Sequence, residues 1–298
     1  MDEARVAALA AAPPVEHVEV RGGPLALLRW HPPAEVPRQR PVLLVHGHTG
    51  SKEDFAALGG LLAGAGHPVV APDGRGQQDS PGTGDAASYG LDAFAADVLG
   101  LVDVLDLAPV HLVGHSFGGL VAREAVLTRP EAVASLTLLG SGPAALPDGP
   151  RRQALLGLVH AVGAGGLPVV LAGVAALADA DPALTAAPQE WRDFLRRRWE
   201  AWDPVALATA SQALLDAGDR TDELRDVARS RRLPLLVLHG EDDDAWPPAL
   251  QEATARRLGA RHVVVPDAAH GPAAERPAAT AAALLEHVDA AESAAGPW

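Results

Sequence analysis

The chain has 298 residues, of which 48% are hydrophobic, and its formal net charge is −14 at pH 7. This length suits one large α/β domain with an insertion or two small domains, and the apolar content is enough for a substantial core. The acidic balance, with Lys52 as the only lysine, argues against nucleic acid and anionic membranes as partners. Because there is no cysteine, disulfides and thiolate metal sites are excluded.

The first residues show no targeting signal. They lack a basic n-region, and residues 7–12 are too short and too weakly apolar for a secretory signal. We therefore expect a cytoplasmic location. The longest apolar segment, residues 159–178, is interrupted by glycines and by Pro168, so we expect no membrane span.

Short β-type runs alternate with helix-like segments in the first half of the chain. Residues 18–20 and 25–30, separated by two glycines, predict an antiparallel hairpin. The further strands that we expect are 41–46, 68–71, 110–113 and 136–139, and the helices between them are 51–65, 91–107 and 120–128. This alternation predicts an α/β fold with a mostly parallel sheet and helices on both faces.

The pattern changes after residue 143, because residues 144–232 contain no convincing strand. Strands resume at 233–238 and 262–265, and a closing helix is expected at 278–291. We therefore predict a core formed by residues 1–143 and 233–298, with a helical cap at 144–232 inserted after the sixth strand. The cap's eleven arginines are balanced by twelve acidic residues, so the count supports no polyanion site.

The sequence around Ser116 predicts a nucleophile. An apolar run ends in Gly-x-Ser-x-Gly, from Gly114 to Gly118, and a helix-compatible segment follows at once. In a strand–nucleophile–helix turn, larger side chains at the two glycine positions would clash, and the serine hydroxyl is exposed at the strand's end. A serine is a poor nucleophile alone, so a base, an acid and an oxyanion site are required elsewhere.

A base and an acid are expected on late loops, because this kind of sheet has the chain order serine, acid, histidine. His270 follows the last expected strand and is the best candidate for the base, whereas His262 and His287 are expected on the surface. The acid is expected after the penultimate strand, where three consecutive aspartates occur. Periodicity does not choose among Asp242, Asp243 and Asp244.

The oxyanion site needs two N–H donors beside Ser116. The N–H of Phe117, which opens the helix, is the first, and the second should come from the loop after Val45. The His46-x-His48 pair in that loop resembles a metal motif, but no Asp-His continuation follows. We expect no metal and no cofactor.

Aromatic residues recur at helical spacing in the second half of the cap. They form an apolar stripe made of Trp191, Phe194, Leu195, Trp199 and Trp202. The stripe suits packing of the cap onto the core, and it also suits an aromatic roof over an apolar acyl or alcohol pocket. For the second role we name Trp191, Phe194, Trp199 and Trp246.

Taken together, these motifs resemble the α/β-hydrolase superfamily, in its capped, esterase- or lipase-like form. The matching motifs are His46-Gly47, Asp73-Gly74-Arg75-Gly76 with Ser80, the Gly114–Gly118 turn, Gly240-x-x-Asp243 with Pro247, and His270 with Glu275 and Pro277. The resemblance implies Ser116 as nucleophile, Asp243 as acid, His270 as base and the His48 N–H as second oxyanion donor. Two departures, Ala269 before the histidine and Gln77-Gln78 after Arg-Gly, leave the substrate subfamily open.

The expected function is a cofactor-free serine hydrolase that cleaves an ester or lactone of a small to medium apolar molecule through an acyl-enzyme. Carbon–carbon hydrolysis, acyl transfer or a biosynthetic tailoring step by the same residues is the alternative. A ligand-binding protein on a hydrolase fold is the alternative of another class. The partner is a small-molecule substrate, and the oligomeric state is open.

Overall fold

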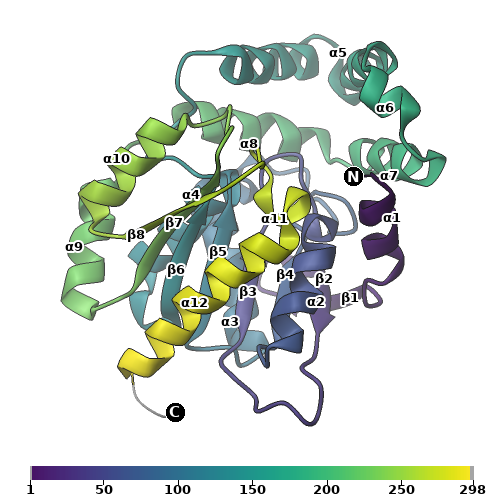
Figure 1. Ribbon diagram of the computed structural model, residues 1–298. Coiled ribbons are helices and arrows are strands. Elements are labelled where there is room, and N and C mark those ends of the chain that lie inside the picture. The colour runs from purple at the N-terminus through teal and green to yellow at the C-terminus, as the bar shows by residue number, and fades with distance from the viewer. Residues whose placement is uncertain (1, 296–298) are drawn as a thin grey trace.

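A computed structural model describes residues 2–295, which form one eight-stranded sheet with helices on both faces (Figure 1). The strand order is β1-β2-β4-β3-β5-β6-β7-β8. The strands are β1 (Glu16–Val20), β2 (Gly23–Trp30), β3 (Val42–Val45), β4 (Val69–Pro72), β5 (Val110–His115), β6 (Val133–Leu139), β7 (Leu235–Gly240) and β8 (Arg261–Val265). The predicted α/β class and the predicted opening hairpin are both confirmed.

The central strands and the edge strand of the sheet differ in burial. Strands β3, β4 and β7 are buried at every residue, as strands of a parallel sheet covered on both faces must be. Strand β1 alternates between exposed and more buried residues, as expected at an edge, and pairs antiparallel with β2. Strands β4, β3, β5, β6, β7 and β8 run parallel, so their carboxyl ends meet along one edge of the sheet.

Helices cover the sheet in two layers. Leu58 and Leu62 of one helix and Leu284 of another pack on one face, whereas Val98, Val121 and Leu224 belong to the cluster on the other. The helices are α1 (Asp2–Ala10), η1 (Lys52–Phe55), α2 (Ala56–Gly64), η2 (Ala86–Ser88), α3 (Leu91–Val104), α4 (Phe117–Thr128), η3 (Pro130–Ala132), α5 (Pro150–Ala180), α6 (Pro182–Ala186), α7 (Gln189–Glu200), α8 (Pro204–Asp216), α9 (Thr221–Arg231), α10 (Pro248–Leu258), α11 (Pro272–Glu275) and α12 (Pro277–Ala295).

Between β6 and β7 the described residues form five helices, α5 to α9. Figure 1 shows α5, α6 and α7 above the sheet, with α8 running beneath α5. Pairing of α5 with α8 and the burial of Leu207 and Leu214 in the main cluster attach this layer to the core. The cap boundaries at 144 and 232 stay a prediction.

Helix α5 is apolar and largely exposed. By length and composition it is apolar enough to cross a membrane, and only 6% of its most apolar window is buried. Its backbone is non-helical at Gly165 and Gly166, and this break divides α5 into two pieces of roughly 22 Å, shorter than the ~30 Å bilayer core. The expectation that no segment spans a membrane stays a prediction.

Helix α1 was not predicted, although its alanines are good helix formers. Its Val6 and Leu9 pack against Trp191 and Phe194 of α7 in a small separate cluster. Arg5 adds a contact, because its guanidinium lies 5.5 Å from the Trp191 ring centroid. Helix α1 therefore packs against α7 of the cap.

Candidate active site

The turn between β5 and α4 holds Ser116 in a strained conformation. Its φ of 55° and ψ of −121° are unusual for a residue with a side chain. A Cβ at Gly114 would lie 2.2 Å from the Gly118 carbonyl oxygen, and one at Gly118 would lie 2.3 Å from the Val45 carbonyl oxygen. Glycine is therefore required at both positions, and the turn presents Ser116 at the carboxyl edge of the sheet.

Three predicted side chains meet at this edge. The Oγ atom of Ser116 lies 3.0 Å from Nε2 of His270, and Nδ1 of His270 lies 3.0 Å from Oδ1 of Asp243. Because a carboxylate only accepts, Nδ1 carries the ring proton and Nε2 is left as an acceptor for the serine hydroxyl. This geometry is that of a nucleophile, a base and an orienting acid.

The carboxylate of Asp243 is buried and held by donors. The Ala245 N–H donates to Oδ1 at 2.9 Å, and the Gln251 amide donates to Oδ2 at 2.9 Å. Burial raises the pKa of Asp243, but the hydrogen bonds from His270, Ala245 and Gln251 outweigh it, so the pKa is lowered overall. Asp243 is therefore a charged carboxylate opposite His270 Nδ1–H.

The neighbouring aspartates have other surroundings. Asp244 forms a two-bond ion pair with Arg151 of α5, at 2.6 and 3.0 Å. Asp242 is exposed, and its backbone N–H donates to the Ala268 carbonyl. The geometry thus joins His270 to Asp243, the aspartate that the Gly-x-x-Asp spacing had favoured.

The loop after β3 lies against the nucleophile. A Cβ at Gly47 would lie 3.0 Å from the Cβ of Ser116, so a larger residue would crowd the serine. Within residues 2–295 the N–H of His48 has no acceptor, and Phe117 supplies the first N–H of α4, where no intrahelical partner exists. The Phe117 N–H lies at the positive end of α4, where an anion is favoured, and the pairing of this group with the His48 N–H stays a prediction.

The His48 side chain links this loop to the cap. Its Nε2 lies 2.9 Å from Oγ of Ser211 on α8, and that hydroxyl donates to the Leu207 carbonyl at 2.6 Å. Because the Ser211 hydroxyl proton is donated to Leu207, the Ser211 oxygen acts as acceptor toward His48, and His48 Nε2–H is the donor. Burial lowers the pKa of His48 to about 4, which keeps the ring neutral.

Sequence reasoning missed two positioning residues. The Nε2–H of His115 donates to the backbone oxygen of His270 at 2.8 Å, and Gln251 bridges Asp243 to the Trp246 carbonyl. Burial lowers the pKa of His115 to about 4, so this ring is neutral. His115 is the first of the two variable positions of Gly-x-Ser-x-Gly, whereas nothing in the sequence singles out Gln251.

The four aromatic residues predicted to line the pocket lie in different parts of the structure. Trp191 and Phe194 stack on each other at 5.4 Å and pack against α1 in the small separate cluster, so their assignment to the substrate pocket stays a prediction. They face α1 because that helix offers Val6 and Leu9 to the apolar stripe. Trp199 packs against the main core.

Trp246 and Trp202 lie beside the site instead. The Trp246 ring is 6.2 Å from the His270 ring, and its indole N–H donates to the Ala144 carbonyl at 3.2 Å. Trp202 was assigned only to the stripe, yet its ring lies 5.9 Å from the His48 ring. These two tryptophans therefore flank the base and the oxyanion loop.

Comparison with known proteins agrees with this geometry. The family model described as alpha/beta hydrolase fold matches residues 40–277. The chain belongs to the α/β-hydrolase family. The sequence is 33% identical over 238 residues to the dihydrolipoyllysine-residue acetyltransferase component of the acetoin cleaving system of Pseudomonas putida, covering 77% of this chain and 58% of that protein. It is also 33% identical over 148 residues to an sn-1-specific diacylglycerol lipase of Mus musculus, covering 49% and 46%.

The family's solved structures have the same architecture over nearly the whole chain. A thermophilic esterase from Thermogutta terrifontis superposes with a TM-score of 0.72 and 25% identity, covering 93% of this chain and 99% of that one. A bromoperoxidase from Bacillus anthracis superposes with a TM-score of 0.74 at 20% identity, over 93% and 100%, and shows the fold alone. The chain spans about half the length of the curated relatives it matches, 58% and 46% for these two.

Proposed function

We propose that this α/β hydrolase cleaves an ester or lactone of a small to medium apolar molecule through an acyl-enzyme. The hydrogen-bonded series Ser116–His270–Asp243 carries the proposal, because both contacts are 3.0 Å and the serine stands on a strained turn. Two N–H groups, of His48 and Phe117, complete the arrangement that acyl transfer requires.

In the first step, Ser116 Oγ attacks the carbonyl carbon while His270 Nε2 takes the hydroxyl proton. The charge on Asp243 stabilises the resulting imidazolium, and the N–H groups of His48 and Phe117 bind the oxyanion. Collapse of the tetrahedral intermediate breaks the ester bond, and His270 returns its proton to the leaving alcohol. Water, deprotonated by His270, then attacks the acyl-enzyme and releases the acid and Ser116.

An apolar substrate is supported by what surrounds the site. Trp202 and Trp246 flank the site, and the buried Phe117 ring lies 6.2 Å from the His48 ring. Names of relatives point the same way, since they include a diacylglycerol lipase, the lipase LipV of Mycobacterium tuberculosis and an esterase.

The decisive experiment compares Ser116→Ala with the wild type on a series of p-nitrophenyl esters and lactones of increasing chain length. We expect loss of nearly all turnover, about 10⁴-fold or more, and loss of fluorophosphonate labelling at residue 116. Ser230→Ala, at an exposed serine of α9, is the control and should behave as wild type. Near wild-type ester turnover by Ser116→Ala would overturn the mechanism.

The same enzyme preparation separates the alternative reactions. Added alcohols and thiols test acyl transfer, because a transferase would give an acylated acceptor in place of the free acid. A panel of 1,3-diketones tests carbon–carbon hydrolysis. Wild-type protein that binds esters but is neither labelled nor active would favour a ligand-binding role.

A further inference from the structure

His67 carries a buried nitrogen without a partner. It lies in the loop between α2 and β4, and its side chain is 1% exposed. Nδ1 lies 2.8 Å from the backbone oxygen of Arg40, and a carbonyl only accepts, so Nδ1 carries the proton. Nε2 therefore presents a bare lone pair, and within residues 2–295 it has no hydrogen-bond partner.

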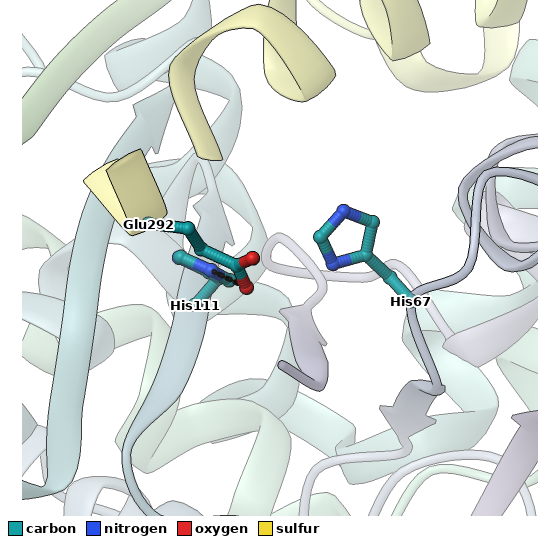
Figure 2. A group of neighbouring side chains, drawn as sticks. All are labelled: His67, His111 and Glu292. Atoms are coloured by element: carbon teal, nitrogen blue, oxygen red, sulfur yellow. Dashed lines mark hydrogen bonds and ion pairs between the residues drawn. The ribbon is translucent and has the colours of Figure 1, made fainter. Parts of the chain in front are cut away.

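Two further ligand groups lie in front of that lone pair. Figure 2 shows His67 reaching toward His111 of β5 and Glu292 of α12, which approach from the other side. One ligand atom from each of His67, His111 and Glu292 lies within 4.8 Å of the others. Asp289, one helical turn before Glu292, adds a carboxylate oxygen 4.0 Å from His67 Nε2.

One distance in the group matches a tetrahedral ion, while Glu292 Oε1 also accepts a hydrogen bond from the Arg40 N–H at 3.0 Å. Nε2 of His111 lies 3.3 Å from Oε1 of Glu292, a long contact for a donor and a carboxylate. Ligands about 2.0 Å from a tetrahedral metal are about 3.3 Å apart. Nδ1 of His111 lies 2.8 Å from Oγ of Ser135, a second partner of the kind that orients metal-bound histidines.

We propose that His67, His111 and Glu292 bind one Zn²⁺ ion, and that the exposed carboxylate of Asp289, which stands outside this group, turns toward the ion as fourth ligand. Two imidazole nitrogens and carboxylate oxygens are ligands typical of zinc, whereas Mg²⁺ and Ca²⁺ prefer oxygen alone. The Nε2 atom of His67 has a free lone pair for the ion. Hydrogen bonds to the Arg40 carbonyl and the Ser135 hydroxyl fix the orientation of the two histidine rings. This proposal departs from the expectation of no metal, which rested on the His46-x-His48 pair and the missing cysteines.

The site's position indicates a structural role. His111 is near the amino end of β5 and Ser116 follows its carboxyl end, so the ion lies at the opposite edge of the sheet from the catalytic site, roughly 16 Å along the strand. The ligands come from the loop before β4, from β5 and from α12, which are far apart in sequence. A bound ion therefore fastens the last helix to the sheet.

The experiment uses full-length, tag-free protein freed of metal by a chelator and then titrated with Zn²⁺ against a chromophoric competitor. We expect one equivalent to bind, a visible Co²⁺ spectrum of tetrahedral type, and a rise in Tm of about 5 °C at a hundredfold excess over Kd. His67→Ala and the isosteric Glu292→Gln should each weaken binding at least 10–100-fold. Ester turnover at 25 °C should be unchanged in both variants.

Controls separate this site from the chain's other histidines. His239 and His262 form a second pair, with their Nε2 atoms 2.9 Å apart, so His262→Ala is the matched control and should bind Zn²⁺ as the wild type does. Asp289→Asn, at a side chain that is 68% exposed, tests the fourth ligand in a variant that leaves the core intact. The proposal is overturned if no equivalent binds, if His67→Ala and Glu292→Gln bind normally, or if His262→Ala abolishes binding.

Discussion

The Nε2 atom of His48 lies 2.9 Å from Oγ of Ser211, and this bond joins the oxyanion loop to cap helix α8. The ring also packs between Phe117 and Trp202, with centroids 6.2 and 5.9 Å away. Because the same residue supplies the proposed oxyanion N–H, the position of the cap and the geometry of the catalytic loop are coupled through one side chain.

We predict that Ser211→Ala lowers both stability and turnover. The variant leaves the ring Nε2–H of His48 without an acceptor, which lowers the free energy of unfolding by about 1–3 kcal/mol. Without this bond the loop after β3 is held less firmly. We expect kcat to fall about tenfold, because a small displacement of an oxyanion donor weakens its stabilisation of the transition state. Urea unfolding and ester kinetics check this, with Gln212→Ala at the next, exposed position as control. An unchanged kcat would show that the loop is held independently of the cap.

The three aspartates after β7 offer a sharp comparison. Asp243→Asn should lower kcat by about 10³–10⁴-fold, because the amide cannot hold the His270 Nδ1–H tautomer or stabilise the imidazolium. Asp244→Asn removes an exposed ion pair with Arg151 and should change stability by less than about 1 kcal/mol. Steady-state kinetics of both variants decide the assignment. A larger loss in Asp244→Asn would place the acid one residue later.

The nucleophile turn can be predicted from its motif, because a Cβ at either glycine would meet backbone at about 2 Å: Gly114 meets Gly118 of the same turn, and Gly118 meets Val45 of the neighbouring strand. Neighbours far apart in sequence are harder to predict. Trp191 and Trp202 share one stripe, yet one packs on α1 and the other beside His48, since the partner of each depends on tertiary packing. His287 was expected on the surface but is 4% exposed, because its face of α12 packs inward.

This separation of the tryptophans predicts different effects of truncation. Trp191→Ala should lower stability by several kcal/mol, about 3 or more, because it leaves a cavity between α1 and α7, while kcat/KM of the folded protein changes little. Trp202→Ala should raise KM for long-chain esters more than for acetates. Thermal unfolding and a chain-length series measure both effects. Equal kinetic effects of the two variants would place Trp191 in the pocket.

Stability should depend on pH through the buried His48 ring. Its pKa is lowered from 6.5 to about 4 by burial, so between those values the unfolded chain binds a proton that the folded chain does not. Stability contributed by the neutral ring is present above pH 6.5 and is lost as the pH falls toward 4, by at most about 3 kcal/mol.

The variant His48→Gln tests this dependence directly, because the amide can still donate to Ser211 but does not titrate. Urea unfolding between pH 4 and 6.5 should show a shallower loss of stability for His48→Gln than for the wild type. His17→Gln, at an exposed histidine, should leave the slope unchanged. Parallel curves for His48→Gln and the wild type would mean that His48 takes up its proton equally in both states, and that the bond to Ser211 does not depend on a neutral ring.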